Sequence, residues 1–268
     1  MGVNDESCYT CGRRYPALWG MAAWLRGGRL EELFVPLVLW GCGAMYLASL
    51  AIDPGGIGSG GLLGLLSPSG ESLFRLGASG ALPVFDYDRW WTVISAGWLH
   101  GGVLHILFNM MAVRNLGPAM VHLYGFARTV VIYTVACVLG FLVSSTAGAY
   151  GTFLPGVLRG GVGLTIGASA SVFGLLGALL HYSRRGGSRQ LGSMVRGWVL
   201  GGLAFGFFIP GIDNWAHFGG LAGGYLASKW LNPFTPEQGN HVLAAMACLV
   251  LSLLAVAASV ITGLPLLR

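Results

Sequence analysis

Two residues that lie far apart in the chain have the types that a nucleophile and its general base require. Ser169 and His217 each lie near the start of an apolar stretch. A serine hydroxyl is a weak nucleophile until a neighbouring base removes its proton. An imidazole has the pKa range to accept that proton and to return it to a leaving amine. Ser169 and His217 are therefore the candidate nucleophile and base of an acyl-transfer site.

His105 and Asn109 are candidates for the hydrogen-bond donors of the same site. Their i, i+4 spacing puts both side chains on one face of a helix. Converging donors can stabilise a developing oxyanion where bulk water is excluded. Polar residues also hold membrane helices together, so the pair by itself leaves both interpretations open.

The apolar stretches contain no carboxylate that could orient the imidazole. Every Asp and Glu, from Asp5 to Glu237, lies in a terminus or between apolar stretches. We therefore predict a Ser-His dyad, with the alternative that Asp213, one helical turn before His217, assists from its loop. The same absence argues against a channel or a proton-coupled or cation-coupled transporter.

The elements that must position these residues are membrane helices. Hydrophobic residues make up 54% of the 268 positions and charged residues only 9%, against about 25% charged in soluble domains. Several apolar stretches have about 20 residues, enough to cross a hydrocarbon core of about 30 Å. The formal net charge of +5 is scattered at the ends of these stretches, so we expect a lipid bilayer around the chain and no nucleic-acid partner.

The fold class that we predict is an all-α polytopic membrane protein with seven helices. They lie at about 33–52, 103–124, 126–148, 169–183, 195–210, 215–230 and 241–264. The segment between the first two carries apolar patches that suit a hairpin in the membrane interface. No small-residue cleavage site follows the first stretch, so we expect it to remain as an anchor.

The distribution of Lys and Arg predicts the orientation in the membrane. With the N-terminus in the cytoplasm, the cytoplasmic side carries Arg13, Arg14, Arg26, Arg29, Arg128, Arg184, Arg185, Arg189, Arg196 and Lys229. The outer side carries only Arg75, Arg89, Arg159 and Arg268. By the positive-inside rule, we expect a multi-pass cell-membrane protein with its N-terminus in the cytoplasm and its C-terminus outside.

Counting residues predicts the depth of the candidate site. From Ser169 to the basic pair Arg184-Arg185 the helix rises roughly 22 Å, too little to cross the core. Ser169 should therefore lie about 8 Å below the outer surface, and the Gly160–Gly167 segment must descend to that depth. His217 lies roughly 18 Å above the inner interface by the same count from Lys229, so the two depths agree.

Three stretches resemble the rhomboid family of intramembrane serine proteases. They are His100-Gly-Gly-Val-Leu-His-Ile-Leu-Phe-Asn-Met110, Gly167-Ala-Ser-Ala-Ser-Val-Phe-Gly174 and Asn214-Trp-Ala-His-Phe-Gly-Gly220. They match the family's HxxxN, GxS and AHxGG elements in that order. The resemblance implies a six-helix rhomboid core and one extra C-terminal transmembrane helix.

The resemblance also implies a division of the chain and an activity. The parts are a cytoplasmic arm at 1–31, a protease core at 32–230 with a long first loop at 53–99, and a linker and seventh helix at 231–268. The implied activity is a serine endopeptidase that cleaves transmembrane protein substrates near the outward end of their helices. Its alternative is an inactive rhomboid-like protein that binds membrane clients.

The resemblance assigns a role to each candidate residue. It makes Ser169 the nucleophile and His217 the base. It puts His105, Asn109 and the Ser169 backbone amide around the oxyanion. Phe173 matches an aromatic residue that packs against the catalytic histidine.

Gly167 fits a need for close backbone approach beside the substrate. The chain departs from the family at Ala170, where glycine is common, and in the first loop, where Trp91-Thr92 replaces a Trp-Arg pair.

Four glycines near His217 are expected to let the sixth span approach the fourth closely enough for the serine and histidine to meet. They are Gly219, Gly220, Gly223 and Gly224.

Cys8 and Cys11 form a CxxC pair in the polar N-terminal arm. One such pair supplies two ligands, whereas a structural zinc site needs four. Zinc at this pair, a free thiol pair and a site shared between two chains all remain open, and we expect no other cofactor.

Overall fold

The computed structural model describes residues 7–8, 10–12, 30–61, 64–151, 163–209 and 211–263. The arginines of the N-terminal arm, Arg159 and Arg268 lie outside them. Within the described residues the long helices are α2 (Leu30–Ile52), α5 (Val103–Tyr124), α6 (Phe126–Tyr150), α7 (Ser169–Arg185), α8 (Arg189–Phe208), α9 (Asn214–Trp230) and α10 (Gly239–Gly263). These helices confirm the predicted all-α polytopic membrane fold.

The long helices differ in whether they can cross a membrane unaided. Among the described residues, α2, α6, α8 and α10 are long and apolar enough to cross, and α5 qualifies together with the bent helical segment before it. The remaining two, α7 and α9, have 17 residues each, which is about 25 Å of rise. The helix that begins at Ser169 is therefore short, as the sequence predicts.

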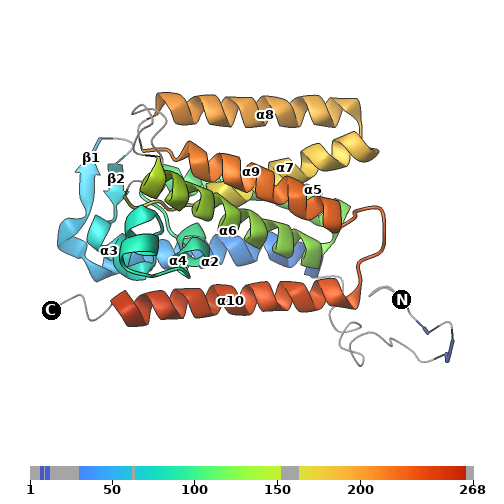
Figure 1. Ribbon diagram of the computed structural model, residues 1–268, viewed down its shortest axis with the longest axis horizontal. Helices are drawn as coiled ribbons and strands as arrows, with labels where there is room; N and C mark the ends of the chain where they lie inside the picture. The colour runs from blue at the N-terminus through green and yellow to red at the C-terminus, as the bar shows by residue number, and fades with distance from the viewer. Residues whose placement is uncertain are drawn as a thin grey trace.

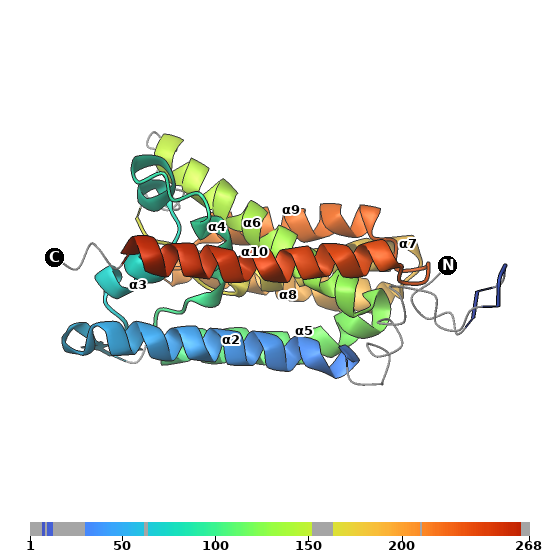
Figure 2. The ribbon, with the colours of Figure 1, turned by 90° about the horizontal axis from the view of Figure 1, so that it is seen from below.

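The two short helices differ in burial, because most of α7 is buried whereas α9 keeps an exposed side with Phe218, Leu226 and Trp230. Both pack against α6, and the outer helices α8 and α10 lie on opposite sides of this group (Figure 1). The view from below shows α2 beside α5 (Figure 2), and these two helices are in contact.

Close packing of α9 depends on the four glycines predicted from the sequence, but they divide between two neighbouring helices. Gly220 and Gly224 face α7, where an added Cβ would overlap the carbonyl oxygens of Ala170 and Gly174. Gly219 and Gly223 instead face α6. Only two of the four glycines therefore bring α9 close to α7, because residues one position apart point to different sides of a helix.

The segment between α2 and α5 consists of short elements. They are a 3₁₀ turn η2 (Pro54–Gly56), an antiparallel pair β1 (Gly58–Gly60) and β2 (Gly64–Ser67), α3 (Gly70–Leu76), a π-helical turn η3 (Leu82–Asp86), α4 (Thr92–Ser95) and a 3₁₀ turn η4 (Ala96–Trp98). We call these elements the first loop. One of the apolar patches predicted here lies partly outside the described residues, at 62–63.

A buried arginine ties the first loop to the last helix. The guanidinium of Arg89 donates to the backbone oxygens of Phe74 at 2.6 Å, Arg75 at 3.3 Å and Ser259 of α10 at 3.0 Å. Thr92 is fully buried and donates its hydroxyl to the Arg89 carbonyl at 2.7 Å. The loop therefore has a buried guanidinium three residues before Thr92.

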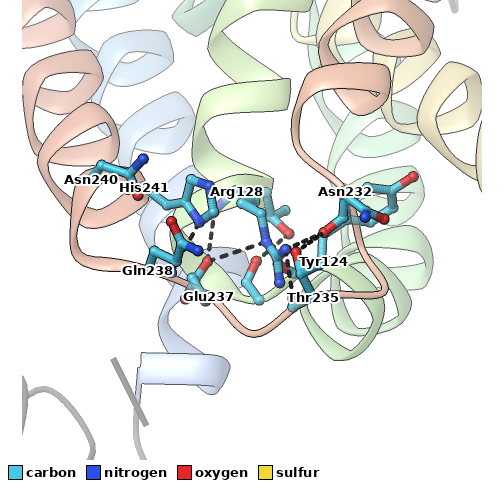
Figure 3. Close-up of polar contacts among 10 residues, drawn as sticks. Tyr124, Arg128, Asn232, Thr235, Glu237, Gln238, Asn240 and His241 are labelled. Carbon is cyan, nitrogen blue, oxygen red and sulfur yellow. Dashed lines mark hydrogen bonds and ion pairs between the residues drawn. The ribbon is translucent and has the colours of Figure 1, made fainter. Parts of the chain in front are cut away.

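A second buried arginine fixes the linker between α9 and α10 (Figure 3). Arg128, at the start of α6, donates to the backbone oxygens of Tyr124, Asn232 and Thr235. Glu237 accepts the backbone N–H of Arg128 at 2.9 Å and lies 4.0 Å from its guanidinium. The linker is thereby attached to the body of the bundle before α10 begins.

Candidate active site

The side chains of Ser169 and His217 meet where α7 and α9 begin. The Ser169 Oγ lies 3.0 Å from the His217 Nε2, at hydrogen-bonding distance. Ser169 is the first residue of α7, and His217 lies one turn into α9. His217 is buried and Ser169 is half-buried. A nucleophile and its base require this arrangement.

Phe173 determines the plane of the histidine ring. Its ring stacks on His217 with centroids 4.2 Å apart and an interplanar angle of 13°. Phe173 lies one turn after Ser169 on α7, so both side chains face α9. On the other side Phe173 contacts α8, where a Cβ added to Gly202 would come within 2.7 Å of the phenyl ring.

His105 presents a ring N–H beside the Ser169 hydroxyl. Its Nδ1 accepts the backbone N–H of Gly101 at 3.2 Å, so in the neutral imidazole the proton is on Nε2. A Cβ added to Gly167 would lie 2.7 Å from that Nε2 and 3.7 Å from the Ser169 Oγ. The His105 donor and the Ser169 hydroxyl therefore flank the same small space, which the missing side chain of Gly167 leaves open.

Asn109 lies one turn further along α5 and is buried. Its Nδ2 donates to the His105 carbonyl at 3.0 Å, which leaves one amide N–H for another acceptor. His105 and Asn109 are thus on one helix face, as their spacing predicts.

These side chains open on a cavity of about 880 Å³. It is bordered by α5, α7, α8, α9 and the segment that precedes Ser169. Its walls include Leu104, Phe108, Met111, Ala112, Trp198, Phe205 and Ile209, together with Ser169, Phe173, His105, Asn109 and His217. The site therefore combines apolar walls with a few convergent polar groups, which is typical of ligand-binding pockets.

Asp213 does not orient His217 directly. The His217 Nδ1 is buried without a hydrogen-bond partner among the described residues, and the Asp213 carboxylate bonds elsewhere. The structure therefore does not show the alternative in which Asp213 assists by bonding to the His217 imidazole.

Other polar residues of the spans take structural places. Ser171 donates to the Tyr133 carbonyl at 2.9 Å and so points away from the site. His181 is buried with its ring edge against Tyr225. His100 is fully buried with its ring centroid 5.1 Å from that of His105. Thr165 and Ser144, which bond to Asp213, belong to no sequence motif, so the sequence did not mark them as site residues.

Cys8 and Cys11 lie far from these residues in the sequence, in one short turn closed by a hydrogen bond from the Gly12 N–H to the Cys8 carbonyl. The part of the chain that the structure describes contains no group of three or more His, Cys, Asp or Glu residues that could hold a metal. Zinc at this pair stays a prediction.

The known proteins that this chain is similar to include several rhomboid proteins. The chain is 32% identical over 190 residues, 69% of its length, to the rhomboid protease GluP of Bacillus subtilis. It is 34% identical over 169 residues to RHOMBOID-like protein 5 of Arabidopsis thaliana and 30% identical over 169 residues to Rhomboid-like protease 5 of Toxoplasma gondii. The matched regions cover 35%, 50% and 18% of these three relatives, so each relative has much additional sequence.

Residues 87–234 match the rhomboid domain. This range begins just before α4, contains the serine, the histidine and the two candidate donors, and ends after α9. The helix α10 lies outside it. Because the match covers more than half of the chain and includes the whole candidate site, the chain belongs to the rhomboid family.

Proposed function

We propose that this chain is an intramembrane serine endopeptidase that uses Ser169 and His217 as a dyad. The observation that carries the proposal is the 3.0 Å contact between the Ser169 Oγ and the His217 Nε2 at the wall of a cavity between membrane helices. The names of two relatives, a rhomboid protease and a rhomboid-like protease, agree with it.

In the proposed reaction, the Ser169 Oγ attacks the carbonyl carbon of the scissile peptide bond while the His217 Nε2 takes the hydroxyl proton. The resulting imidazolium gives that proton to the departing amine, and an acyl-enzyme remains on Ser169. Water then attacks the ester with His217 as base, which releases the acid and restores the serine.

The tetrahedral intermediates carry an oxyanion that needs hydrogen-bond donors. The candidates are the Nε2–H of His105, the free amide N–H of Asn109 and the backbone N–H of Ser169. The last is available because the first N–H groups of a helix have no partner within that helix. Donors held in place before the reaction are usually the largest single source of stabilisation.

The proposed substrates are transmembrane proteins. The cavity extends from Gly101, just before α5, to Leu116 on that helix, opposite residues of α8, and its length suits an extended or partly unwound segment. A helix hides its carbonyls in internal hydrogen bonds, so a client must unwind before attack. Substrates are therefore expected to carry Gly, Pro or other weak helix formers near the cut.

The proposed site of cleavage is near the outward end of the client helix. This depth assumes an N-terminus in the cytoplasm and a C-terminus outside, with the arm at 1–31, the core at 32–230 and the seventh helix at 231–268. Mass spectrometry of the products tests it, because a cut at the bilayer midplane or on the cytoplasmic side contradicts both the depth and the orientation.

The decisive experiment compares the wild type with Ser169→Ala and His217→Ala against a panel of single-span membrane proteins in liposomes. Each variant should abolish cleavage while remaining folded, because members of a catalytic unit are nearly as costly to remove singly as together. Cleavage by Ser169→Ala would assign the nucleophile to another residue. A wild type that binds clients without cleaving any would favour the inactive rhomboid-like alternative.

A fluorophosphonate or chloroisocoumarin probe gives a second readout that needs no substrate. Labelling should occur at Ser169 and should disappear in His217→Ala. If His217→Ala is labelled as fast as the wild type, His217 is not the base.

A further inference from the structure

The carboxylate of Asp213 joins three segments around the candidate dyad. Its Oδ1 accepts the backbone N–H of Ala216 at 3.1 Å and so caps the start of α9. Its Oδ2 accepts the hydroxyl of Thr165 at 2.7 Å and also the hydroxyl of Ser144 on α6. One side chain thus connects the helix of the base, the segment before the nucleophile, and α6.

Thr165 is the link to the nucleophile, because it lies four residues before Ser169. Its backbone N–H and C=O both bond to Ser79 of the first loop, at 2.8 and 3.0 Å. Two residues later, the N–H of Gly167 donates to the Ala96 carbonyl at 3.0 Å. The first loop therefore holds this segment by its backbone, and Asp213 holds it by the Thr165 side chain.

The glycine contacts between α9 and α7 lie on the far side of the dyad from Thr165. Gly220 and Gly224 bring the two backbones together at Ala170 and Gly174, one and five residues after Ser169. A hydrogen bond between a hydroxyl and a carboxylate is short and directional. The bond from Thr165 to Asp213 joins the segment before Ser169 to the start of α9, and each of its two residues lies four positions before a candidate catalytic residue.

We propose that Asp213 is a positioning residue, which holds the start of α9 against the segment before Ser169 and so maintains the serine-to-histidine distance. The inference rests on the proposed function. It differs from the role of a third catalytic residue, since the carboxylate does not bond to the imidazole.

Two pairs of variants of the full chain test this role in liposomes with a cleavable transmembrane peptide. Asp213→Ala removes all three bonds, and Asp53→Ala is its matched control, because Asp53 also caps a helical turn, η2, but at the end of α2 and outside the cavity. Thr165→Val removes one hydroxyl at nearly constant shape, whereas Thr165→Ser keeps it.

Asp213→Ala and Thr165→Val are each expected to lower kcat about 10-fold to 100-fold with KM changed less than about twofold, because a misplacement of about 1 Å can cost that much in rate. Asp53→Ala and Thr165→Ser should stay within about threefold of the wild type. The Asp213→Ala/Thr165→Val double variant should be no slower than Asp213→Ala alone, because both changes remove the same bond.

Three results would overturn the inference: an unchanged kcat in Thr165→Val, a rise in KM at constant kcat, or additive losses in the double variant. If Asp213→Ala does not fold, the comparison of Thr165→Val with Thr165→Ser decides the question. Cleavage by Ser169→Ala in the same assay would overturn the proposed nucleophile and the inference with it. If Ser169→Ala is inactive but Thr165→Val keeps the wild-type kcat, only the positioning role of Asp213 is overturned.

Discussion

Gly167 shows most directly how one residue shapes the candidate site. Its φ of +123° lies in the region that residues with a side chain rarely adopt. A Cβ there would also lie 2.7 Å from the His105 Nε2. Backbone conformation and space thus both require glycine between the candidate nucleophile and the candidate oxyanion donor.

We predict that Gly167→Ala lowers kcat at least about 10-fold, since the added methyl group displaces His105 or the segment before Ser169. Gly163→Ala is the control, because that position has no neighbour within 4 Å of the added Cβ. Rates of probe labelling and peptide cleavage measure the effect. Equal rates for the two variants would contradict this account of the oxyanion site.

At the scale of the elements, the contact of α7 with α9 determines whether the serine and the histidine can meet. Gly224 has no room for a methyl group against the Gly174 backbone. We expect Gly224→Ala to reduce the free energy of unfolding by about 1–3 kcal/mol, the usual cost of overpacking, and to reduce activity because the helices move apart.

The matched control is Gly201→Ala on α8, where nothing lies within 4 Å of the added Cβ. Its stability should be unchanged or slightly higher, because alanine favours helix. Thermal unfolding in detergent compares the two variants. A Gly224→Ala protein as stable and as active as Gly201→Ala would show that α7 and α9 tolerate a wider separation.

The helix α10 lies outside the matched rhomboid domain, yet it is bonded into the first loop. Ser259 is fully buried, its hydroxyl lies 3.1 Å from that of Ser95, and its carbonyl accepts from Arg89. We predict that Ser259→Leu lowers the free energy of unfolding by about 1–3 kcal/mol, because the larger side chain has no space beside Gly77 and Ser95.

Ala257→Leu adds a similar side chain on the exposed side of the same helix and should leave the thermal stability unchanged. Equal destabilisation by the two variants would mean that α10 tolerates leucine no better on its exposed side than against the loop.

At the scale of the whole molecule, the native cysteines can report the orientation in the membrane. Cys11 is exposed, Cys8 is half-buried, and Cys42 and Cys137 are buried within the bundle. The backbone N–H of Cys11 lowers the pKa of the Cys8 thiol, which raises its thiolate fraction and its reactivity at neutral pH. The proposed orientation puts this N-terminal pair in the cytoplasm. A membrane-impermeant maleimide should therefore react with the pair in inside-out vesicles only.

Labelling of the pair in right-side-out vesicles would place the N-terminus outside and would refute the proposed orientation. The Cys8→Ser/Cys11→Ser double variant is the control for labelling elsewhere. It should cleave a model transmembrane peptide at the rate of the wild type, because the pair lies on the arm and not in the candidate site.

The sequence by itself determined the membrane class and the long helices, and it singled out Ser169 and His217 as the candidate dyad. A bilayer requires long apolar stretches, so these are visible without any knowledge of contacts, and polar residues inside them stand out. The bounds of α5 agree with the predicted 103–124 at both ends, because glycine flanks this apolar stretch on each side.

Only the tertiary structure decided what the loop residues and the glycines contact. The partners of Asp213 are Thr165 and Ser144, which lie 48 and 69 residues away, and Arg89 reaches Ser259 across 170 residues. No spacing in one sequence encodes such pairs, because they depend on how each helix is rotated and how the first loop folds back. The same reason explains why two of the four glycines face α6 rather than α7.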